Sequence, residues 1–394
     1  MRQYIIITAS YWSFTLTDGA LRMLVVLYFH QLGYSPLEIA LLFLFYELFG
    51  VVTNLLGAWI AARFGLAATL LAGLLLQILA LGMLLVDEAW LTVPYVMAAQ
   101  ALSGIAKDLN KMSAKSSVKL LAGAGEGRLY KFVAVLTGSK NALKGLGFFS
   151  GGVLLTLLGF QGSIAAMAGM LAVVTVVTSV LVDFQLGKTS FKPKFRHLMS
   201  KSKPVNRLSA ARFFLFGSRD VWFVVALPVY LQLQLGWSST AVGTFLAVWI
   251  IGYGAVQAAA PIVTGGRSGR TPDGRSVMYW GIALIVIPLM LVGAIQTNLD
   301  PSVVIVSGLL IFGVIFAMNS AIHSYLIVSY ADHEGVTLDV GFYYMSNAAG
   351  RLIGTILSGS VFQLWGLEAC LAVSAAFVIC STLAAATLPT RTIV

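Results

Sequence analysis

The chain has 394 residues, of which 59% are hydrophobic and only 10% are charged. Soluble globular domains carry about 25% charged residues, so this composition excludes a soluble domain and is typical of a protein that crosses a membrane many times. The formal net charge of +10 is concentrated in short segments between apolar stretches. It therefore does not by itself indicate a nucleic-acid partner.

A membrane-spanning helix needs about 20 mostly apolar residues, and the sequence contains twelve such stretches. The first is not a cleaved signal peptide, because it contains Asp18 and Arg22 and is longer than the apolar region of such a peptide. The twelve predicted spans lie near residues 4–28, 37–61, 66–86, 91–113, 130–158, 163–183, 209–234, 241–264, 277–297, 302–328, 340–365 and 367–388.

The predicted loops fall into two sets, one rich in Lys and Arg and the other without either. By the positive-inside rule, both termini and the loop at 184–208 are cytoplasmic. One predicted cytoplasmic loop, 330–339, departs from the rule because it contains Asp332, Glu334 and Asp339.

The first span carries Asp18 and Arg22, which lie four residues apart on one helical face and can pair. This pair is either a neutral contact that holds helices together or part of a substrate or proton site. The choice between these two interpretations stays open from the sequence.

Glu47, in the second span, has no basic neighbour in its own helix. It is either protonated or paired with a basic residue of another span, and its functional interpretation is proton coupling. The fourth span ends with Lys107, Asp108 and Lys111. These three residues form either a solvated helix end or the cytoplasmic mouth of an anion path.

The fifth span holds Lys140, Asn141 and Lys144, and the two lysines share a helical face with Gly147 and Gly151. Small residues allow close helix packing, so packing is the expected role of the glycines. A lysine in the middle of a membrane has no such structural role, and ligand contact is the expectation for Lys144 above all.

The longest polar segment, 184–208, separates six spans from six. It is too short for a domain and reads as a basic linker on an anionic inner leaflet. The predicted organisation is an N-terminal six-helix bundle at 1–183, the linker, and a C-terminal bundle at 209–394. The sequence lacks a G-x-x-x-x-G-K-[ST] loop, so ATP-driven transport within this chain is not expected.

In the second half, Arg212 lies near the start of the seventh predicted span and is expected to extend to the cytoplasmic interface. Arg219 and Asp220 are adjacent in the same span. In the tenth span Asn319 and His323 lie four residues apart. His323 is either a hydrogen-bonded core residue or a proton relay, because histidine titrates near neutral pH.

Charges inside the spans are mostly positive. Each costs roughly 2.5–3.5 kcal/mol near the bilayer centre, so it must face protein, water or a ligand. The excess of positive charge predicts a path for an anion. The basic residues are Arg22, Lys107, Lys111, Lys140, Lys144, Arg212, Arg219 and Arg351, and the acidic ones are Asp18, Glu47, Asp108 and Asp220.

The two halves repeat each other in the same orientation, which is one of the plans of secondary transporters. Asp18 matches Asp220, and Lys144 matches Arg351. The second pair would face each other across a pseudo-two-fold axis, where an Arg fork and a Lys point charge suit a phosphate-like dianion. Further matches are Gly104 with Gly313, Asn110 with Asn319, Asn141 with Asn347, Gly147 with Gly354 and Gly152 with Gly359.

With its twelve spans, central basic loop and parallel repeat, the chain resembles the major facilitator superfamily along its whole length. The loop signature of that family is reduced here to the run GAWIAARFG at 57–65, where Ala62 replaces the expected acidic residue. In the fifth span, Phe148 stands where the antiporter signature has proline. A generic drug–proton antiporter is therefore not expected.

More narrowly, the chain resembles the organoarsenical-efflux permeases of arsenic-resistance operons, the ArsJ type. The resembling runs lie at 11–22, 42–57, 106–121 and 136–145. The resemblance implies export of 1-arseno-3-phosphoglycerate, made from arsenate by a partner glyceraldehyde-3-phosphate dehydrogenase, across a bacterial inner membrane. The two cysteines, Cys370 and Cys380, lie in the last span as packing residues, whereas a site for trivalent arsenic would need clustered thiolates.

The sequence therefore predicts an all-α membrane protein with twelve transmembrane helices in two parallel six-helix repeats, the major facilitator fold. It is expected to be a transporter without cofactor or metal, and not an enzyme. The open alternatives are an importer or exchanger of sugar phosphates or other organic anions, and a membrane enzyme acting on a phospho-lipid. The predicted substrate-binding residues are Arg22, Lys140, Asn141, Lys144, Arg219, Asn347 and Arg351; the predicted ion-coupling residues are Asp18, Glu47, Asp220 and His323; and Lys107, Asp108 and Lys111 form the predicted mouth.

Overall fold

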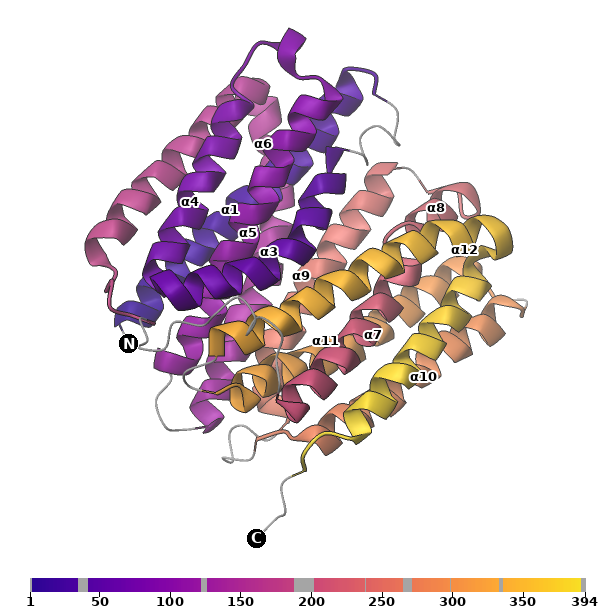
Figure 1. The fold of residues 1–394 in the computed structure, drawn as a ribbon. Coiled ribbons are helices and arrows are strands. Elements are labelled where there is room, and N and C mark those ends of the chain that lie inside the picture. The colour runs from indigo at the N-terminus through magenta and orange to yellow at the C-terminus, as the bar shows by residue number, and fades with distance from the viewer. Residues whose placement is uncertain are drawn as a thin grey trace. The chain divides into compact units, whose positions relative to one another are not determined.

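The computed structural model describes residues 2–34, 42–121, 126–187, 202–237, 239–264, 271–297, 299–332 and 336–390. Most of the predicted linker and Glu334 lie outside these residues. Within them the regular structure is helical throughout (Figure 1). The helices are α1 (Arg2–Gln31), α3 (Leu44–Phe64), α4 (Leu66–Met83), α5 (Val93–Leu121), α6 (Glu126–Leu181), α7 (Lys203–Phe223), α8 (Ala226–Leu233), α9 (Ser239–Val263), α10 (Gly274–Ile295), α11 (Pro301–Tyr330) and α12 (Val336–Ala386), with a 3-10 helix, η1, at Glu88–Trp90.

Two of these helices each contain two of the predicted spans. α6 turns sharply at Gly159, with a φ of 66°, and α12 turns at Gly366, with a φ of 79°. Glycine adopts positive φ at little cost because it has no Cβ. With both helices divided there, and with α7 and α8 taken together as the seventh span, the described helices correspond to the twelve predicted spans. The all-α membrane fold is confirmed.

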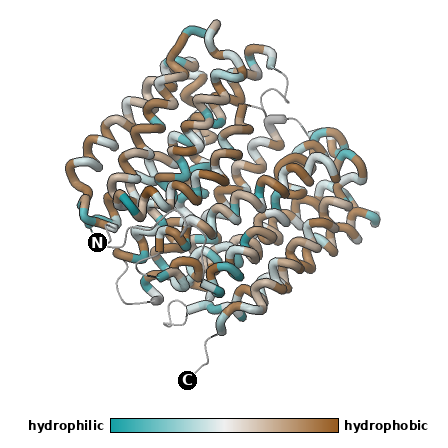
Figure 2. The backbone as a smooth tube through the Cα atoms, in the orientation of Figure 1, coloured by the Kyte–Doolittle hydropathy of each residue, from teal (hydrophilic) through white to brown (hydrophobic). Residues whose placement is uncertain are grey.

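The apolar surface agrees with a membrane environment. Among the described residues, eight helical segments are long and apolar enough to cross a membrane, and the more polar α1 and α5 have 30 and 29 residues. Large apolar side chains such as Phe149 and Val180 are 73% and 76% exposed. Figure 2 shows hydrophobic residues along the helices, with hydrophilic residues set among them.

At two helix ends, the helix continues into residues that the prediction placed outside the spans. α5 continues to Leu121, well beyond the predicted end at 113, because its last turns are polar but remain helical. α7 begins at Lys203, inside the predicted linker, with proline in its first turn. Proline is favoured there, since the missing N–H would have no helical partner. Apolar length therefore identified the membrane part of each helix but not its full extent.

The chain divides into two compact units, described separately below. Unit 1 comprises residues 1–124, 139–200 and 331–345, and unit 2 comprises 125–138, 201–330 and 346–394. The first turns of α6 thus belong to unit 2, and the first turns of α12 belong to unit 1. The bundle limits predicted from the linker remain a prediction.

Equivalent glycine contacts occur in the two units. A Cβ added at Gly147 would lie 2.5 Å from the carbonyl oxygen of Leu16 on α1, and one added at Gly354 would lie 2.7 Å from that of Gly217 on α7. Each glycine brings a long helix into backbone contact with the first helix of its own half. The expected packing role of the matched glycines is confirmed.

Candidate functional site

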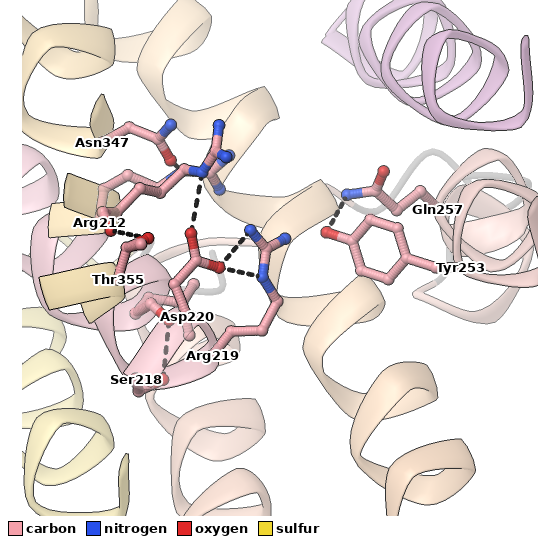
Figure 3. Close-up of polar contacts among 10 residues, drawn as sticks. Arg212, Ser218, Arg219, Asp220, Tyr253, Gln257, Asn347 and Thr355 are labelled. Atoms are coloured by element: carbon pink, nitrogen blue, oxygen red, sulfur yellow. Dashed lines mark hydrogen bonds and ion pairs between the residues drawn. The ribbon is translucent and has the colours of Figure 1, made fainter. Parts of the chain in front are cut away.

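In unit 2, one buried carboxylate holds two arginines. Arg219 approaches Asp220 Oδ1 with Nε at 2.6 Å and Nη2 at 2.5 Å, while Arg351 Nε on α12 donates to Oδ2 at 3.0 Å. Figure 3 shows the Asp220 carboxylate with dashed lines from Arg219 on one side. One negative charge therefore balances two positive charges, and the cluster keeps a net charge of about +1.

The two guanidinium groups differ from the carboxylate in access. The side chain of Asp220 is 0% exposed, whereas those of Arg219 and Arg351 are 15% and 34% exposed. A ligand can therefore reach the arginines while the carboxylate stays covered. Arg351 is the most accessible charge of the cluster.

Aromatic rings surround the Arg219 guanidinium. Its central carbon lies 4.9 Å from the ring centroid of Phe216, 5.5 Å from that of Phe316 and 6.0 Å from that of Phe223. Cation–π attraction to the ring faces offsets part of the cost of removing the cation from water. The rings thus hold Arg219 in place beside Asp220.

Arg212 corrects a prediction. It was expected to extend to the interface, but it is 3% exposed. Its Nε donates to Asn347 Oδ1 at 2.9 Å, and its Nη1 donates to Ser320 Oγ at 3.0 Å. The prediction was wrong because α7 begins at Lys203, which makes Arg212 the tenth residue of the helix instead of one of its first.

A series of side-chain hydrogen bonds that the sequence analysis did not predict continues from Ser320. Gln257 Nε2, on α9, donates to Ser320 Oγ at 3.1 Å. It also donates to the Tyr253 hydroxyl at 2.9 Å (Figure 3). A glutamine in the middle of an apolar span was the available signal. Nearby on α11, His323 is fully buried, and neither of its ring nitrogens has a hydrogen-bond partner among the described residues. The hydrogen-bonded core alternative for His323 is therefore not supported.

In unit 1, Asp18 and Glu47, the acids of the first two spans, have partners on other helices. Arg22 Nη2 donates to Glu47 Oε1 at 2.9 Å, and the Tyr46 hydroxyl donates to Asp18 Oδ1 at 2.7 Å. The suggested Asp18–Arg22 pair is thus replaced by two contacts to α3. Of the alternatives for Glu47, pairing with a basic residue of another span is confirmed.

Tyr46 is the second residue that sequence reasoning missed. The Lys107 ammonium lies 3.7 Å from its ring centroid, and the Arg22 guanidinium carbon lies 5.0 Å from it. Tyrosine is common in membrane spans, so the residue type alone gave no signal. Its position next to Glu47 was the only local indication.

The predicted mouth lies within a helix. Lys111 Nζ is 2.5 Å from Asp108 Oδ1, and α5 continues ten residues beyond Lys111 to Leu121. These residues therefore do not form a solvated helix end. The Lys111 ammonium also lies 4.9 Å from the ring centroid of Tyr344, in the part of α12 that belongs to unit 1.

The predicted ligands on α6 are half-buried. Lys140, Asn141 and Lys144 are all of intermediate exposure, and the Lys144 ammonium lies 5.7 Å from the Phe148 ring centroid. Because Lys144 and Arg351 belong to different units, their approach across a pseudo-two-fold axis stays a prediction.

The acidic loop that broke the charge rule lies near a lysine. Lys119, in the last turn of α5, donates to the carbonyl oxygen of Ala331. Burial lowers the pKa of Lys119, and the nearby carboxylates of Asp332 and Asp339 oppose that shift. Asp332 and Asp339 thus lie near a basic helix end within unit 1.

Neither the cysteines nor the other metal-binding residue types form a candidate metal site among the described residues. Both cysteines are free; Cys370 is buried, as expected of a packing residue, whereas Cys380 is exposed. Among the described residues, no three side chains of His, Cys, Asp or Glu gather as metal ligands would.

Solved structures of transporters share the fold. The human organic anion transporter MFSD10 (TETRAN) has a TM-score of 0.76 at 15% identity, with 98% of this chain and 99% of that one covered. The E. coli fucose:proton symporter FucP has 0.74 at 12%, covering 99% and 100%. A bacterial homologue of the iron transporter ferroportin, in an outward-facing state, has 0.75 at 15%, covering 98% and 99%.

At such low identity these likenesses establish the fold alone, and no curated protein matches the chain. The sequence itself decides the family. The model of the Major Facilitator Superfamily matches residues 7–336 and 208–392, which together span nearly the whole chain. The chain therefore belongs to the major facilitator superfamily of membrane transporters.

Proposed function

We propose that this transporter exports a small phosphorylated organic anion, 1-arseno-3-phosphoglycerate. The observation that carries the proposal is the cluster of Arg219, Asp220 and Arg351, in which one buried carboxylate balances two guanidinium groups. The remaining positive charge attracts an anion. The human structural neighbour that is described as an organic anion transporter is in keeping with a cargo of that charge.

The fork of Arg351 suits a phosphate. Two N–H donors of one guanidinium can meet two phosphate oxygens, while Arg219 keeps its contact with Asp220. The rest of the proposed substrate-binding set comes from the sequence and comprises Arg22, Lys140, Asn141, Lys144 and Asn347. Of these, Asn347 already accepts from Arg212, so it would contribute its amide N–H groups.

The arsenylated identity of the cargo rests on the resemblance of four sequence runs to organoarsenical-efflux permeases. The thiol chemistry of the chain supports an oxyanion over arsenite. Trivalent arsenic is thiophilic, but Cys370 is buried and Cys380 is exposed on the same last helical segment of α12. A three-thiolate site cannot be made from two cysteines.

Membrane energetics favour export of such a cargo. An anion that leaves a cell moves with the inside-negative potential, which supplies about 2.3 kcal/mol per elementary charge at 100 mV. A dianion therefore gains about 4.6 kcal/mol on leaving, without ATP. This agrees with a chain that has no P-loop.

The proposal includes the cellular setting. The chain would lie in a bacterial inner membrane with both termini cytoplasmic, and a glyceraldehyde-3-phosphate dehydrogenase would supply the cargo. Asp18, Glu47, Asp220 and His323 are the proposed ion-coupling residues. An importer or exchanger of sugar phosphates is the alternative within the family, whereas a membrane enzyme acting on phospho-lipid is excluded by membership of a transporter family.

Arsenate growth tests examine the proposal directly. Cells that lack other arsenic export should tolerate more arsenate, and accumulate less arsenic, when they make this chain together with an arsenic-operon dehydrogenase than with the dehydrogenase alone. Arsenite tolerance should not change. Arg351→Ala should lose the protection at an equal membrane level, because the accessible guanidinium is gone.

Two controls define failure. Replacing Cys370 and Cys380 by Ala should leave arsenate protection intact, since neither sulfur is expected to meet the cargo. Protection against arsenite, or loss of arsenate protection in the cysteine-free variant, would contradict the oxyanion proposal. Uptake of labelled 3-phosphoglycerate without arsenate protection would favour the sugar-phosphate alternative.

A further inference from the structure

Tyr46 on α3 is the residue at which the charged side chains of unit 1 meet. Its hydroxyl donates to Asp18 Oδ1 at 2.7 Å, and its ring lies 3.7 Å from the Lys107 ammonium and 5.0 Å from the Arg22 guanidinium carbon. One side chain therefore connects an acid of α1 with cations of α1 and α5. It is also almost completely buried.

The backbone of Tyr46 is held firmly against α5. A Cβ added at Gly104 would lie only 2.6 Å from the Tyr46 carbonyl oxygen. Such close contact keeps the two helices together at this level. The backbone that carries the Tyr46 ring is therefore fixed close to α5, the helix that carries Lys107.

Three acidic and three basic side chains lie around Tyr46. Arg22 is paired with Glu47, and Lys111 is paired with Asp108. Asp18 and Lys107 are the remaining acid and base of this network, and Tyr46 lies between them. Because the six charges sum to zero, one proton added to Asp18 would leave the network with a net charge of about +1.

We propose that Tyr46 couples protonation of Asp18 to the availability of Lys107 and Arg22 for an anion. When Asp18 is ionised, the Tyr46 O–H stabilises the carboxylate and the network is neutral. When Asp18 is protonated, the cations on the Tyr46 ring lack that counter-charge and attract an anionic ligand. Linkage is reciprocal, so a bound anion in turn favours the proton.

Several ionisable groups besides Tyr46 bear on Asp18. Arg22 of α1 interacts electrostatically with Asp18, and Asp108 of α5, like Asp18, interacts with the buried Tyr11. The residues that face or adjoin Asp18 are Tyr11 and Arg22 from α1, Tyr46 and Glu47 from α3, Lys107 and Asp108 from α5, and Lys144 from α6, whose backbone packs against Gly19.

The first test needs no substrate. Infrared difference spectra of the full-length protein in lipid, recorded across pH, follow protonation of its carboxyl groups, and the band missing in Asp18→Asn belongs to Asp18. Tyr46→Phe keeps the ring and removes only the donor to the carboxylate. The midpoint of the Asp18 band should then move to higher pH by about one unit, because a hydrogen bond to the charged form has been lost.

Tyr11→Phe is the matched control. It also removes a buried hydroxyl near Asp18, but that hydroxyl has no hydrogen-bond partner among the described residues. The midpoint should be unchanged in this variant. An unmoved midpoint in Tyr46→Phe, or an equal shift in both variants, overturns the inference.

The second test addresses the coupling, which rests on the proposed anion transport. Binding of 3-phosphoglycerate should strengthen as pH falls through the Asp18 midpoint, and the dependence should shift with that midpoint in Tyr46→Phe. The titration of the ligand itself is common to both proteins and cancels in the comparison. Binding whose pH dependence is the same in both proteins overturns the coupling. Absence of binding by the unmutated protein at every pH also overturns the coupling, whereas the proposed export fails separately, by absence of arsenate protection.

Discussion

At the scale of single residues, the two repeat-related aspartates hold different partners. Both oxygens of Asp220 accept from arginines, whereas an oxygen of Asp18 accepts from a tyrosine hydroxyl. The difference arises because Arg22 is paired with Glu47. Two guanidinium groups therefore contact the aspartate of unit 2, whereas a tyrosine hydroxyl contacts the aspartate of unit 1.

Replacing Arg by Lys should lower transport at one position of unit 2 and stability at another. Arg351→Lys keeps the charge but loses the planar fork, so transport in proteoliposomes should fall at least about tenfold, by about 1.4 kcal/mol or more. Thermal stability should stay close to that of the unmutated protein, because Arg351 is partly exposed.

Arg212→Lys is the structural counterpart. It removes the contacts to Asn347 and Ser320 inside the protein, so stability should fall by about 1–3 kcal/mol. Unfolding in detergent, followed by size-exclusion chromatography, measures this loss. Equal effects of the Arg351 and Arg212 changes on both stability and transport would contradict the division of roles.

The sequence predicted part of this site. The contact between Arg219 and Asp220 follows from adjacency, and the repeat pointed to Arg351 as a functional residue. The partner of Glu47 required knowledge of which helices are neighbours, so it remained one of two alternatives. Tyr46 was missed because an aromatic side chain in an apolar span has no distinctive pattern, although its ring and hydroxyl join three charges.

At the scale of helices, hydropathy located the spans but not their ends. The polar last turns of α5 and the first turns of α7 are helical outside the apolar stretches. The predicted breaks between spans at 159–162 and at 366 correspond to sharp turns at Gly159 and Gly366. A single residue with positive φ is enough to reverse a helix, and hydropathy cannot detect it.

Two glycines of α12 in different surroundings test the close helix packing. Gly354→Ala would place a methyl group 2.7 Å from the Gly217 carbonyl oxygen and 3.1 Å from Asp220 Cβ, so stability should fall by about 1–3 kcal/mol. Gly359→Ala in the same helix meets nothing within 4 Å. Its stability should be unchanged or rise by up to about 1 kcal/mol, since alanine favours helix.

Thermal unfolding of the two purified variants measures the difference, and transport adds a second comparison. Gly354→Ala should also weaken transport because the crowded atoms include Asp220 itself. If Gly359→Ala destabilises the protein as much as Gly354→Ala, the loss would reflect alanine in this helix generally and not the contact with α7.

At the scale of the whole molecule, two helices each contribute to both units. The first turns of α6 belong to unit 2, where the Thr264 hydroxyl donates to the Tyr130 hydroxyl at 2.8 Å. The first turns of α12 belong to unit 1, where Gly341 packs on Ala58 of α3. No local pattern predicts these contacts, because the partners lie far apart in sequence.

A transporter that alternates access by rocking its N-terminal and C-terminal six-helix halves must break contacts between α6 and α9 in part of its cycle, because these helices belong to different halves of the sequence. In unit 2, a Cβ added at Gly138 would lie 2.8 Å from the Cβ of Ala258 on α9, and it would also lie 2.4 Å from the Gly254 carbonyl oxygen and 2.5 Å from the Ala258 backbone nitrogen, so the backbones must move apart to admit it. A disulfide needs a Cβ separation of about 3.5–4.5 Å, so the two helices need to part by only about 1 Å. Gly138→Cys with Ala258→Cys should therefore form a disulfide on oxidation.

The pair should be tested in a chain whose Cys370 and Cys380 are replaced by Ala. Oxidation should stop transport in proteoliposomes, and a reducing agent should restore it, because α6 is tied to α9 only while the bond exists. Each single cysteine variant sets the baseline for any packing cost at Gly138 and should not respond to oxidant. Full transport with the disulfide demonstrably formed would mean that the contact between α6 and α9 persists through the whole cycle. The first turns of α6 would then stay with unit 2 at every stage of transport.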